Sequence, residues 1–225
     1  ATLLIQGMIP ANRSSFAVKG AMHHPDACFR AELEKRLKEK GVLLDKQRIE
    51  EGERHALLSL DSPFLKDIVY YTNNSVNLFA EALGELISPT DYARTVKVEL
   101  SHIGIDSCGI TLKDASGLSP ANAVPAEVFT DLLIWAKGHL SDAFVSSLPR
   151  GNVDWGLRVY SDHPVLRENV IAKTGSMSGV RALAGYLKNQ KGETLAFTIL
   201  VNNYVGDPVK VQEIIRDLLK DIADK

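Results

Sequence analysis

The sequence has little that would tie the protein to metals, cofactors or disulfide bonds. Its 225 residues include only two cysteines, Cys28 and Cys108, which lie far apart in the chain. Cys28 falls within a helical pattern and Cys108 beside a predicted strand, so we expect two buried free thiols and no bridge. His23 and His24 stand near Cys28, but no fourth ligand is spaced nearby, and we expect neither a metal ion nor a cofactor.

No charge of one sign dominates, and no long hydrophobic run occurs. The 26 Lys and Arg residues are balanced by 28 Asp and Glu residues, which gives a formal net charge of -2. We therefore expect no electrostatic attraction to nucleic acid or to an anionic membrane. No apolar stretch approaches the roughly 20 residues of a transmembrane helix. With 45% hydrophobic and 24% charged residues, the composition is that of a globular protein with an apolar core.

The most informative stretch is 170–186, which reads V-I-A-K-T-G-S-M-S-G-V-R-A-L-A-G-Y. Two apolar runs flank the turn residues Ser178 and Gly179, a pattern that predicts a β-hairpin. The first strand then carries a cation, two hydroxyl groups and a residue without a side chain: Lys173, Thr174, Gly175 and Ser176. This set suits an anionic, extended ligand at the edge of a sheet, although a surface hairpin with a solvated Lys is the alternative. A phosphate-binding P-loop is excluded, because its glycines would have to precede the Lys.

The remaining pattern mixes helices and strands without regular alternation. Apolar spacing predicts helices over 25–40, from 62–63 to a break at 72–75, around 78–86, and over 90–102, 125–137 and 208–222. Short apolar runs predict strands within 1–20 and at 55–60, 109–113 and 194–203, the last as a central strand, while 151–168 appears irregular. In the helix around 78–86 we expect five buried side chains: Leu78, Phe79, Ala82, Leu83 and Leu86. This order indicates an α+β fold and not alternating βαβ units.

Ser75 and Asn77 lie where two predicted helices meet, a place where such residues are ordinary helix caps. Their combination with Lys-Thr-Gly at 173–175 changes this interpretation, because Ser-x-x-Lys, Ser-x-Asn and Lys-Thr-Gly together form the active-site set of penicillin-binding proteins and class A β-lactamases. Three segments, in this order, resemble the D-alanyl-D-alanine carboxypeptidases/endopeptidases of the class C penicillin-binding proteins: Y-T-N-N-S-V-N-L-F-A-E-A-L at 71–83, L-K-D-A-S-G-L-S-P-A-N at 112–122 and A-K-T-G-S-M-S-G-V-R-A-L-A-G-Y at 172–186.

The resemblance implies an α+β fold of the β-lactamase/transpeptidase type, with an antiparallel sheet and a helical subdomain. It also implies a serine-type hydrolase of the bacterial periplasm or cell envelope, which cleaves peptidoglycan stem peptides ending in D-Ala-D-Ala and is acylated by β-lactams. By the same resemblance, Ser75 relays a proton to the leaving D-Ala nitrogen, Asn77 holds the substrate amide, and Lys173 supplies a positive field over the site.

The resemblance also assigns substrate-binding residues on the hairpin. Thr174 and Ser176 are expected to hydrogen-bond the terminal carboxylate, and Gly175 to let the substrate backbone come close. One N–H of the oxyanion hole lies on the strand just after Gly175. Arg181, on the returning strand, either adds affinity for the carboxylate or is a plain surface residue.

The sequence departs from the family at the nucleophile. No serine is followed by Lys three residues later; Ser15 and Ser62 each have a Lys four residues on. We therefore expect this chain alone to be inactive and to be part of a larger protein, with 1–60 the tail of an inserted domain and 61–225 the C-terminal part of the transpeptidase-like domain. The alternative is a non-catalytic envelope protein that binds peptidoglycan with the same fold, and a true β-lactamase has less support.

The helix that carries the nucleophile in the family packs behind the sheet. Without it, we expect Leu183, Phe197 and Ile199 to have reduced cover, each uncovered side chain costing about 2 kcal/mol. We therefore expect the chain either to form a homodimer through this face or to be less stable than the larger protein.

Overall fold

The chain divides into two units, residues 1–59 and 60–225, and the computed structural model describes residues 24–42, 61, 63–151 and 155–225. In the first unit it describes one helix, α1 (Pro25–Glu39), which confirms the helix predicted at 25–40. Gly41 follows it with a left-handed φ of 76°, a conformation that ends helices and favours glycine. The strands predicted within 1–20 and at 55–60 lie outside the described residues, and the assignment of the two units to an inserted and a transpeptidase-like domain stays a prediction.

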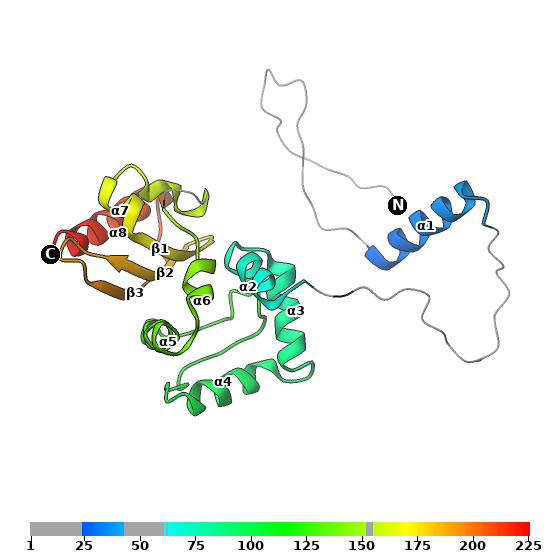
Figure 1. Ribbon diagram of the computed structural model, residues 1–225, viewed down its shortest axis with the longest axis horizontal. Coiled ribbons are helices and arrows are strands. Elements are labelled where there is room, and N and C mark those ends of the chain that lie inside the picture. Colours follow the sequence, from blue (N-terminus) through cyan, green and yellow to red (C-terminus); the bar gives the residue numbers. More distant parts are fainter. Residues whose placement is uncertain (1–23, 43–60, 62, 152–154) are drawn as a thin grey trace, which may run out of the picture. The chain divides into compact units, whose positions relative to one another are not determined.

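The second unit begins with helices, continues into a sheet and ends with one further helix (Figure 1). Its helices are α2 (Leu65–Asn73), α3 (Asn77–Ile87), α4 (Tyr92–His102), α5 (Ala126–His139), α6 (Asp142–Ser147), a 3₁₀ helix (Trp155–Tyr160), α7 (Pro164–Asn169) and, after the sheet, α8 (Pro208–Ala223). Its strands are β1 (Val170–Met177), β2 (Val180–Lys188) and β3 (Thr194–Asn202). None of the helices in the described ranges is long and apolar enough to cross a membrane. The predicted α+β order is confirmed. The expectation that Cys28 and Cys108 are buried was wrong, because both are exposed.

The three strands form an antiparallel sheet in the order β1-β2-β3, and the predicted hairpin is confirmed as β1 and β2. Ser176 lies opposite Arg181, and Gly179 turns the chain with a φ of 68°. The prediction that 194–203 forms a central strand was wrong. Within the described part of the chain, β3 pairs with β2 alone, so β2 is the central strand.

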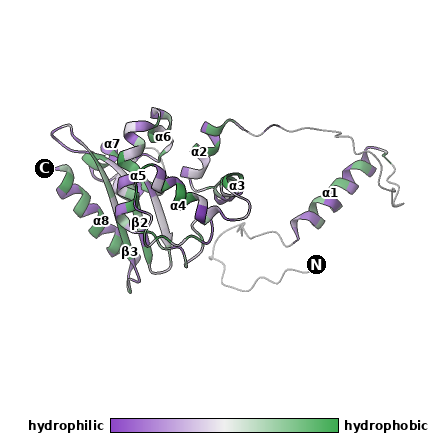
Figure 2. Ribbon diagram, turned by 90° about the horizontal axis from the view of Figure 1, so that it is seen from below, coloured by the Kyte–Doolittle hydropathy of each residue, from purple (hydrophilic) through white to green (hydrophobic). Residues whose placement is uncertain are grey.

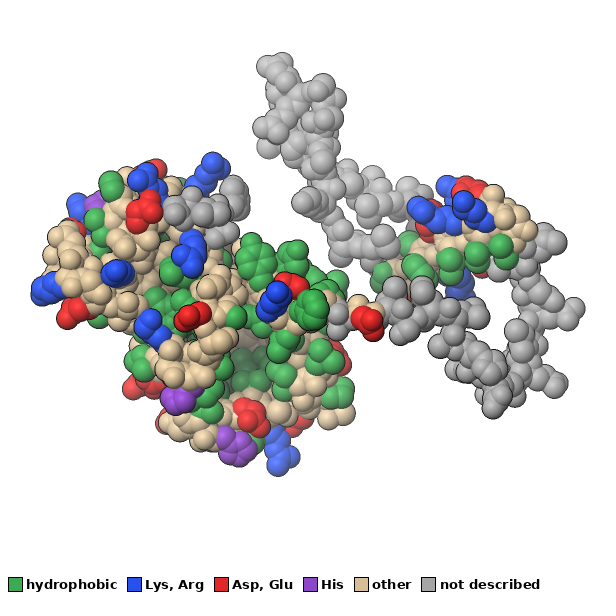
Figure 3. Space-filling model, viewed as in Figure 1, with side chains coloured by type: hydrophobic (Ala, Val, Ile, Leu, Met, Phe, Trp, Pro, Cys, Tyr) green, Lys and Arg blue, Asp and Glu red, His purple; other side chains and the backbone are tan. Residues whose placement is uncertain are grey.

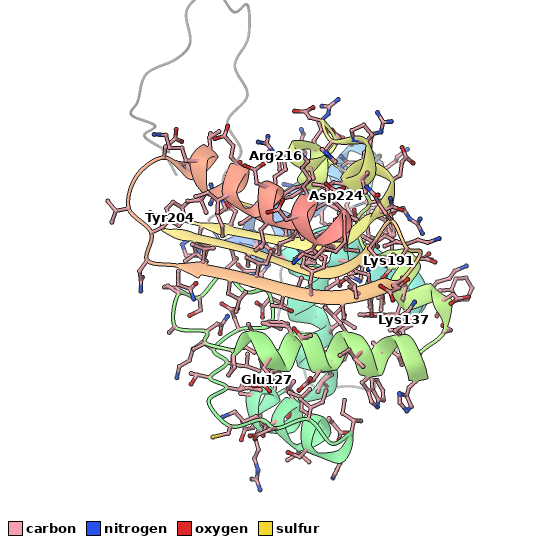
Figure 4. All side chains as sticks on the ribbon, turned by 90° about the vertical axis from the view of Figure 1, so that its left-hand side faces the viewer. Glu127, Lys137, Lys191, Tyr204, Arg216 and Asp224 are labelled. Atoms are coloured by element: carbon pink, nitrogen blue, oxygen red, sulfur yellow. The ribbon has the colours of Figure 1, made fainter. Side chains whose placement is uncertain are left out.

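The sheet lies between α8 on one face and α5 on the other (Figure 4). The hydrophobic side of α8 (Figure 2) packs on the sheet together with α7 and the 3₁₀ helix. This cluster contains five leucines with 0% exposure: Leu157, Leu166, Leu183, Leu187 and Leu219. The expectation that Leu183 lacks cover was therefore wrong, because α8 and its neighbours cover it; Phe197 and Ile199 are partly buried against the same cluster. The homodimer through this face stays a prediction.

Three local predictions were wrong where the elements are short. The segment expected to be irregular at 151–168 contains the 3₁₀ helix and α7, and each spans only six residues, too few to show a helical period. The strand expected at 109–113 is a single bridge between Thr111 and Ala123. Helix α2 begins at Leu65 after Phe64 as its N-cap residue, two positions later than expected.

Helix α3 exposes apolar side chains that were expected to be buried. Leu78 and Leu86 are 78% and 77% exposed, and Ala82 between them is also exposed. Its buried residue is Gly84, where an added Cβ would lie 2.7 Å from the Cβ of Ala115. The helix therefore packs closely against Ala115 at a residue that has no side chain. Hydrophobic side chains gather on the surface of this helical part (Figure 3).

Candidate active site

Lys173 and Ser75, 98 residues apart in sequence, meet in the structure. The Lys173 Nζ donates a hydrogen bond of 2.6 Å to the Ser75 Oγ and another of 2.6 Å to the Thr174 carbonyl oxygen. Burial lowers the pKa of Lys173, because the charged ammonium is less well solvated there. Among the described residues no carboxylate forms an ion pair with it. The cation is thus directed at a hydroxyl group and a carbonyl group, and no acid among the described residues compensates its charge.

Ser75 occupies a strained turn at the end of α2. Its φ is 66°, and its N–H and that of Val76 donate to the carbonyl groups of Thr72 and Tyr71, both at 3.0 Å. This is a Schellman helix end, in which the left-handed position is usually glycine. A left-handed conformation costs a residue with a Cβ roughly 1–2 kcal/mol. Backbone strain of this kind occurs mainly at functional sites, where the surrounding structure holds it in place.

Asn77 is the first residue of α3, two positions after Ser75. Its side chain is exposed, and no described residue forms a hydrogen bond with it. The structure therefore places Asn77 near Ser75 but does not bring it into contact with Lys173. Its amide group keeps both donor and acceptor atoms for a ligand.

Among the described residues, the edge of β1 is covered in its first half only. The Ala172 N–H donates to the Pro149 carbonyl oxygen at 2.9 Å, and the Gly151 N–H to the Val170 carbonyl oxygen at 3.2 Å. In an antiparallel strand every second residue directs its N–H and C=O to the same edge. Thr174 and Ser176 therefore present their N–H groups at the second, uncovered half of this edge. The Ser176 N–H is the one that the resemblance assigns to an oxyanion hole.

Gly175 has a structural reason to lack a side chain. A Cβ at this position would lie 3.1 Å from the Cβ of Ala182 on β2. The close approach to the neighbouring strand is enough to explain the glycine, whether or not a ligand also approaches it. The predicted role of Gly175 in substrate binding stays a prediction.

Arg181 lies beside Ser176 on the adjoining strand. Its Nη1 donates to the Ser176 Oγ at 2.6 Å and to the carbonyl groups of Val180 and Met177 at 2.9 and 3.2 Å. Its guanidinium carbon lies 5.8 Å from the centre of the Tyr204 ring, and its Nε is buried without a hydrogen-bond partner. No described carboxylate pairs with this charge. Arg181 is thus held at the same end of the hairpin as Ser176, and Thr174 faces the same side of the strand.

The loop at 114–122 holds α3 in place. The Asp114 carboxylate accepts hydrogen bonds from the N–H groups of Gly117 and Ser119 and from the Asn122 side chain, as in a structural turn. Sequence reasoning missed Glu81, which accepts a 2.9 Å bond from the Ser116 N–H and so joins the loop to α3. Burial opposes ionisation of Asp114, but these hydrogen bonds together outweigh it and lower its pKa.

Sequence and structure comparisons agree on one family. Residues 1–224 match the D-Ala-D-Ala carboxypeptidase 3 (S13) family. The chain is 30% identical over 244 residues to a D-alanyl-D-alanine carboxypeptidase of Actinomadura sp. (strain R39). This alignment covers 99% of the chain and 45% of that protein. It is 28% identical over 223 residues to the D-alanyl-D-alanine carboxypeptidase DacB of Haemophilus influenzae. This alignment covers 90% of the chain and 46% of that protein.

Solved structures support the same assignment. Penicillin-binding protein 4 (DacB) of Haemophilus influenzae, in complex with a β-lactam, superposes with a TM-score of 0.78 at 28% identity, covering 93% of this chain and 54% of that one. An extended-spectrum β-lactamase superposes with a TM-score of 0.58 at 18% identity, covering 71% of this chain and 63% of that one, and this likeness shows a shared fold alone. The chain spans about half the length of the curated relatives it matches. With an α+β fold of the β-lactamase type and a match over nearly all of its residues, the chain belongs to the D-Ala-D-Ala carboxypeptidase 3 (S13) family.

Proposed function

We propose that this chain supplies part of the active site of a serine-type D-Ala-D-Ala carboxypeptidase that acts on peptidoglycan peptides in the bacterial envelope. The observation that carries the proposal is the 2.6 Å contact between Lys173 and Ser75, because it joins the Lys-Thr-Gly and Ser-x-Asn motifs across 98 residues. The acylated serine and its Lys belong to a Ser-x-x-Lys segment that this sequence does not contain.

The contact suits Ser75 to relay a proton. Because the Lys173 Nζ donates to the Ser75 Oγ, the hydroxyl hydrogen of Ser75 is left to donate elsewhere. In our proposal the serine of the Ser-x-x-Lys segment attacks the carbonyl carbon between the two D-Ala residues and gives its hydroxyl proton to the Lys of that segment. The peptide C–N bond then breaks, and the leaving nitrogen takes a proton from Ser75, which regains one from the protonated Lys. Water later hydrolyses the acyl-enzyme bond. The charge of Lys173 favours the anionic groups of the transition state.

The uncovered half of the β1 edge is the proposed site for the end of the substrate. Its terminal carboxylate would bind the hydroxyl groups of Thr174 and Ser176, with Arg181 adding a charge that has no acidic partner among the described residues. The Ser176 N–H would stabilise the oxyanion, and the Asn77 amide would hold the substrate backbone. A β-lactam carboxylate would occupy the same place.

The test compares the chain with an extended protein, meaning a polypeptide that joins this chain to a Ser-x-x-Lys segment from its own gene or from a relative. After incubation with penicillin, intact mass spectrometry should show one adduct on the extended protein, on the serine of Ser-x-x-Lys, and none on the chain alone. The extended protein should also release D-Ala from a D-Ala-D-Ala peptide, and the chain alone should not. An adduct on the chain alone would place the nucleophile within these 225 residues. An extended protein that binds the peptide but is never acylated would instead support the non-catalytic alternative.

A further inference from the structure

One short segment that begins at the last residue of α6 contacts both sides of the Ser75–Lys173 pair. We call residues 147–151 the brace. At its first residue the Ser147 Oγ accepts a 2.6 Å hydrogen bond from the Asn73 Nδ2 and donates one of 2.6 Å to the Phe144 carbonyl oxygen. Asn73 ends α2, two residues before Ser75, and is 74 residues away from Ser147 in sequence. The brace thus holds the helix end from which the Ser75 turn extends.

The other end of the brace lies along β1. The Pro149 carbonyl oxygen accepts from the Ala172 N–H at 2.9 Å, immediately before Lys173, and the Gly151 N–H donates to the Val170 carbonyl oxygen. Arg150 forms a bridge with Ile171 between these two bonds. Five consecutive residues therefore join the Ser75 turn to the strand that carries Lys173.

The brace itself has little freedom to move. Ser147 and Leu148 are 4% and 5% exposed, and Pro149 and Gly151 are also buried. Leu148 packs with Leu133 of α5 and Tyr186 of β2. A Cβ on Gly151 would lie 3.0 Å from two backbone carbonyl oxygens of α7, so its backbone is tightly enclosed. A fixed segment between two functional groups can set their separation.

We propose that the brace sets the distance between Ser75 and Lys173, and that Asn73 and Ser147 are positioning residues for this pair. The inference rests on the proposed function only in treating the pair as catalytic. Ser75 itself sits in a turn whose hydrogen bonds go back to α2, so the turn moves with that helix. Without the Ser147 hydroxyl, the half-buried Asn73 amide loses its bond to α6, and the end of α2 is free to move away from β1.

The experiment measures the contact directly by NMR on the folded chain. Wild-type protein should show a nuclear Overhauser effect between the Lys173 Hε and the Ser75 Hβ protons, and a Lys173 Cε titration below the ordinary lysine pKa. The Ser147→Ala variant should lose this effect, and its Lys173 pKa should move towards the ordinary value as water reaches the ammonium group. The control is Ser146→Ala, an exposed serine in the same helix, which should behave as wild type.

A second variant keeps the test decisive if Ser147→Ala does not fold. Asn73→Ala removes the same hydrogen bond from the other side and leaves the Ser147 hydroxyl bonded to Phe144, and it should give the same loss. The inference is overturned if either folded variant is less stable but keeps the wild-type Overhauser effect and Lys173 titration, because Ser147 and Asn73 then act on stability alone. These readouts need no acylation, so failure of the proposed function would leave their result unchanged.

Discussion

The sheet and the helical part of the second unit hold their share of the site in different ways. Beneath the sheet, five leucines are completely buried, and Lys173 lies on a strand paired along its length. In the helical part, the buried cluster of Leu100, Ile105, Ile110 and Val128 keeps 3–9% exposure, and two leucines of α3 are almost fully exposed. Ser75 is therefore placed by individual hydrogen bonds rather than by a closely packed core. The helical half of the site should be the easier one to displace.

The largest difference is expected in stability. Leu183→Ala, in the fully buried cluster, should lower the free energy of unfolding by about 3 kcal/mol through lost burial and a new cavity. Leu78→Ala, on the exposed side of α3, should change it by less than about 0.5 kcal/mol. Urea denaturation of both variants measures the two values. Equal losses would mean that α3 is covered in solution and that the contrast between the two parts is wrong.

An effect of similar size is expected in catalysis. In the extended protein, Lys173→Ala should remove about 3 kcal/mol of transition-state stabilisation, as the loss of one electrostatic donor typically does. Penicillin acylation should slow by roughly a hundredfold. Stopped-flow acylation kinetics provide the measurement, with Lys188→Ala on the exposed end of β2 as the control. Acylation close to the wild-type rate would make Lys173 a structural residue.

The strained turn gives a smaller effect with an unusual sign. Ser75→Gly should be more stable than Ser75→Ala by about 1 kcal/mol, because glycine adopts the left-handed conformation without a Cβ clash. Both variants lose the hydroxyl that accepts from Lys173, so in the extended protein both should lose activity to a similar degree. Thermal melts of the two variants measure the cost of the backbone strain, and their acylation rates measure the contribution of the hydroxyl group to catalysis. If Ser75→Ala were the more stable variant, the turn would not be strained in solution.

The smallest effect concerns pH. The hydrogen bonds to Asp114 lower its pKa in the folded state below the ordinary value of 3.8. The stabilisation from this carboxylate is therefore complete above that value and disappears as the pH falls through the lower, folded-state pKa. The Asp114→Asn variant should lose less stability than the wild type in that acidic range. Near neutral pH, the unfolding free energies of both proteins should change with pH in the same way. Urea midpoints measured from pH 6 downwards test this, and identical acid profiles for both proteins would contradict it.

The success of sequence reasoning followed the range of the interactions. The hairpin at 170–186 was predictable because the two apolar runs and the Ser178-Gly179 turn are both local. Helices α5 and α8 were predictable because each is long enough to repeat its apolar period several times. The pairing of Ser75 with Lys173 came from a family resemblance, since no local rule joins residues 98 positions apart.

The failures have the opposite origin. The exposure of Leu78 and Leu86 could not be foreseen, because an apolar stripe shows which residues share a face but not whether that face is covered. No sequence pattern indicated the hydrogen bond between Asn73 and Ser147, because asparagine at a helix end and serine in a short helix are both common. Only the folded chain shows that they meet.

The partial cover of the β1 edge also limits what can add to the sheet. The brace occupies the edge beside residues 170–172. Within the described part of the chain, this leaves only the outward groups of Thr174 and Ser176, about 7 Å apart along the strand. The Thr174 carbonyl group already accepts from Lys173, which shortens the available ladder further. An edge of this length is too short to pair with a whole strand of another molecule, so β1 is a poor site for edge-to-edge aggregation. The same edge is long enough to form backbone hydrogen bonds with the last two residues of an extended peptide.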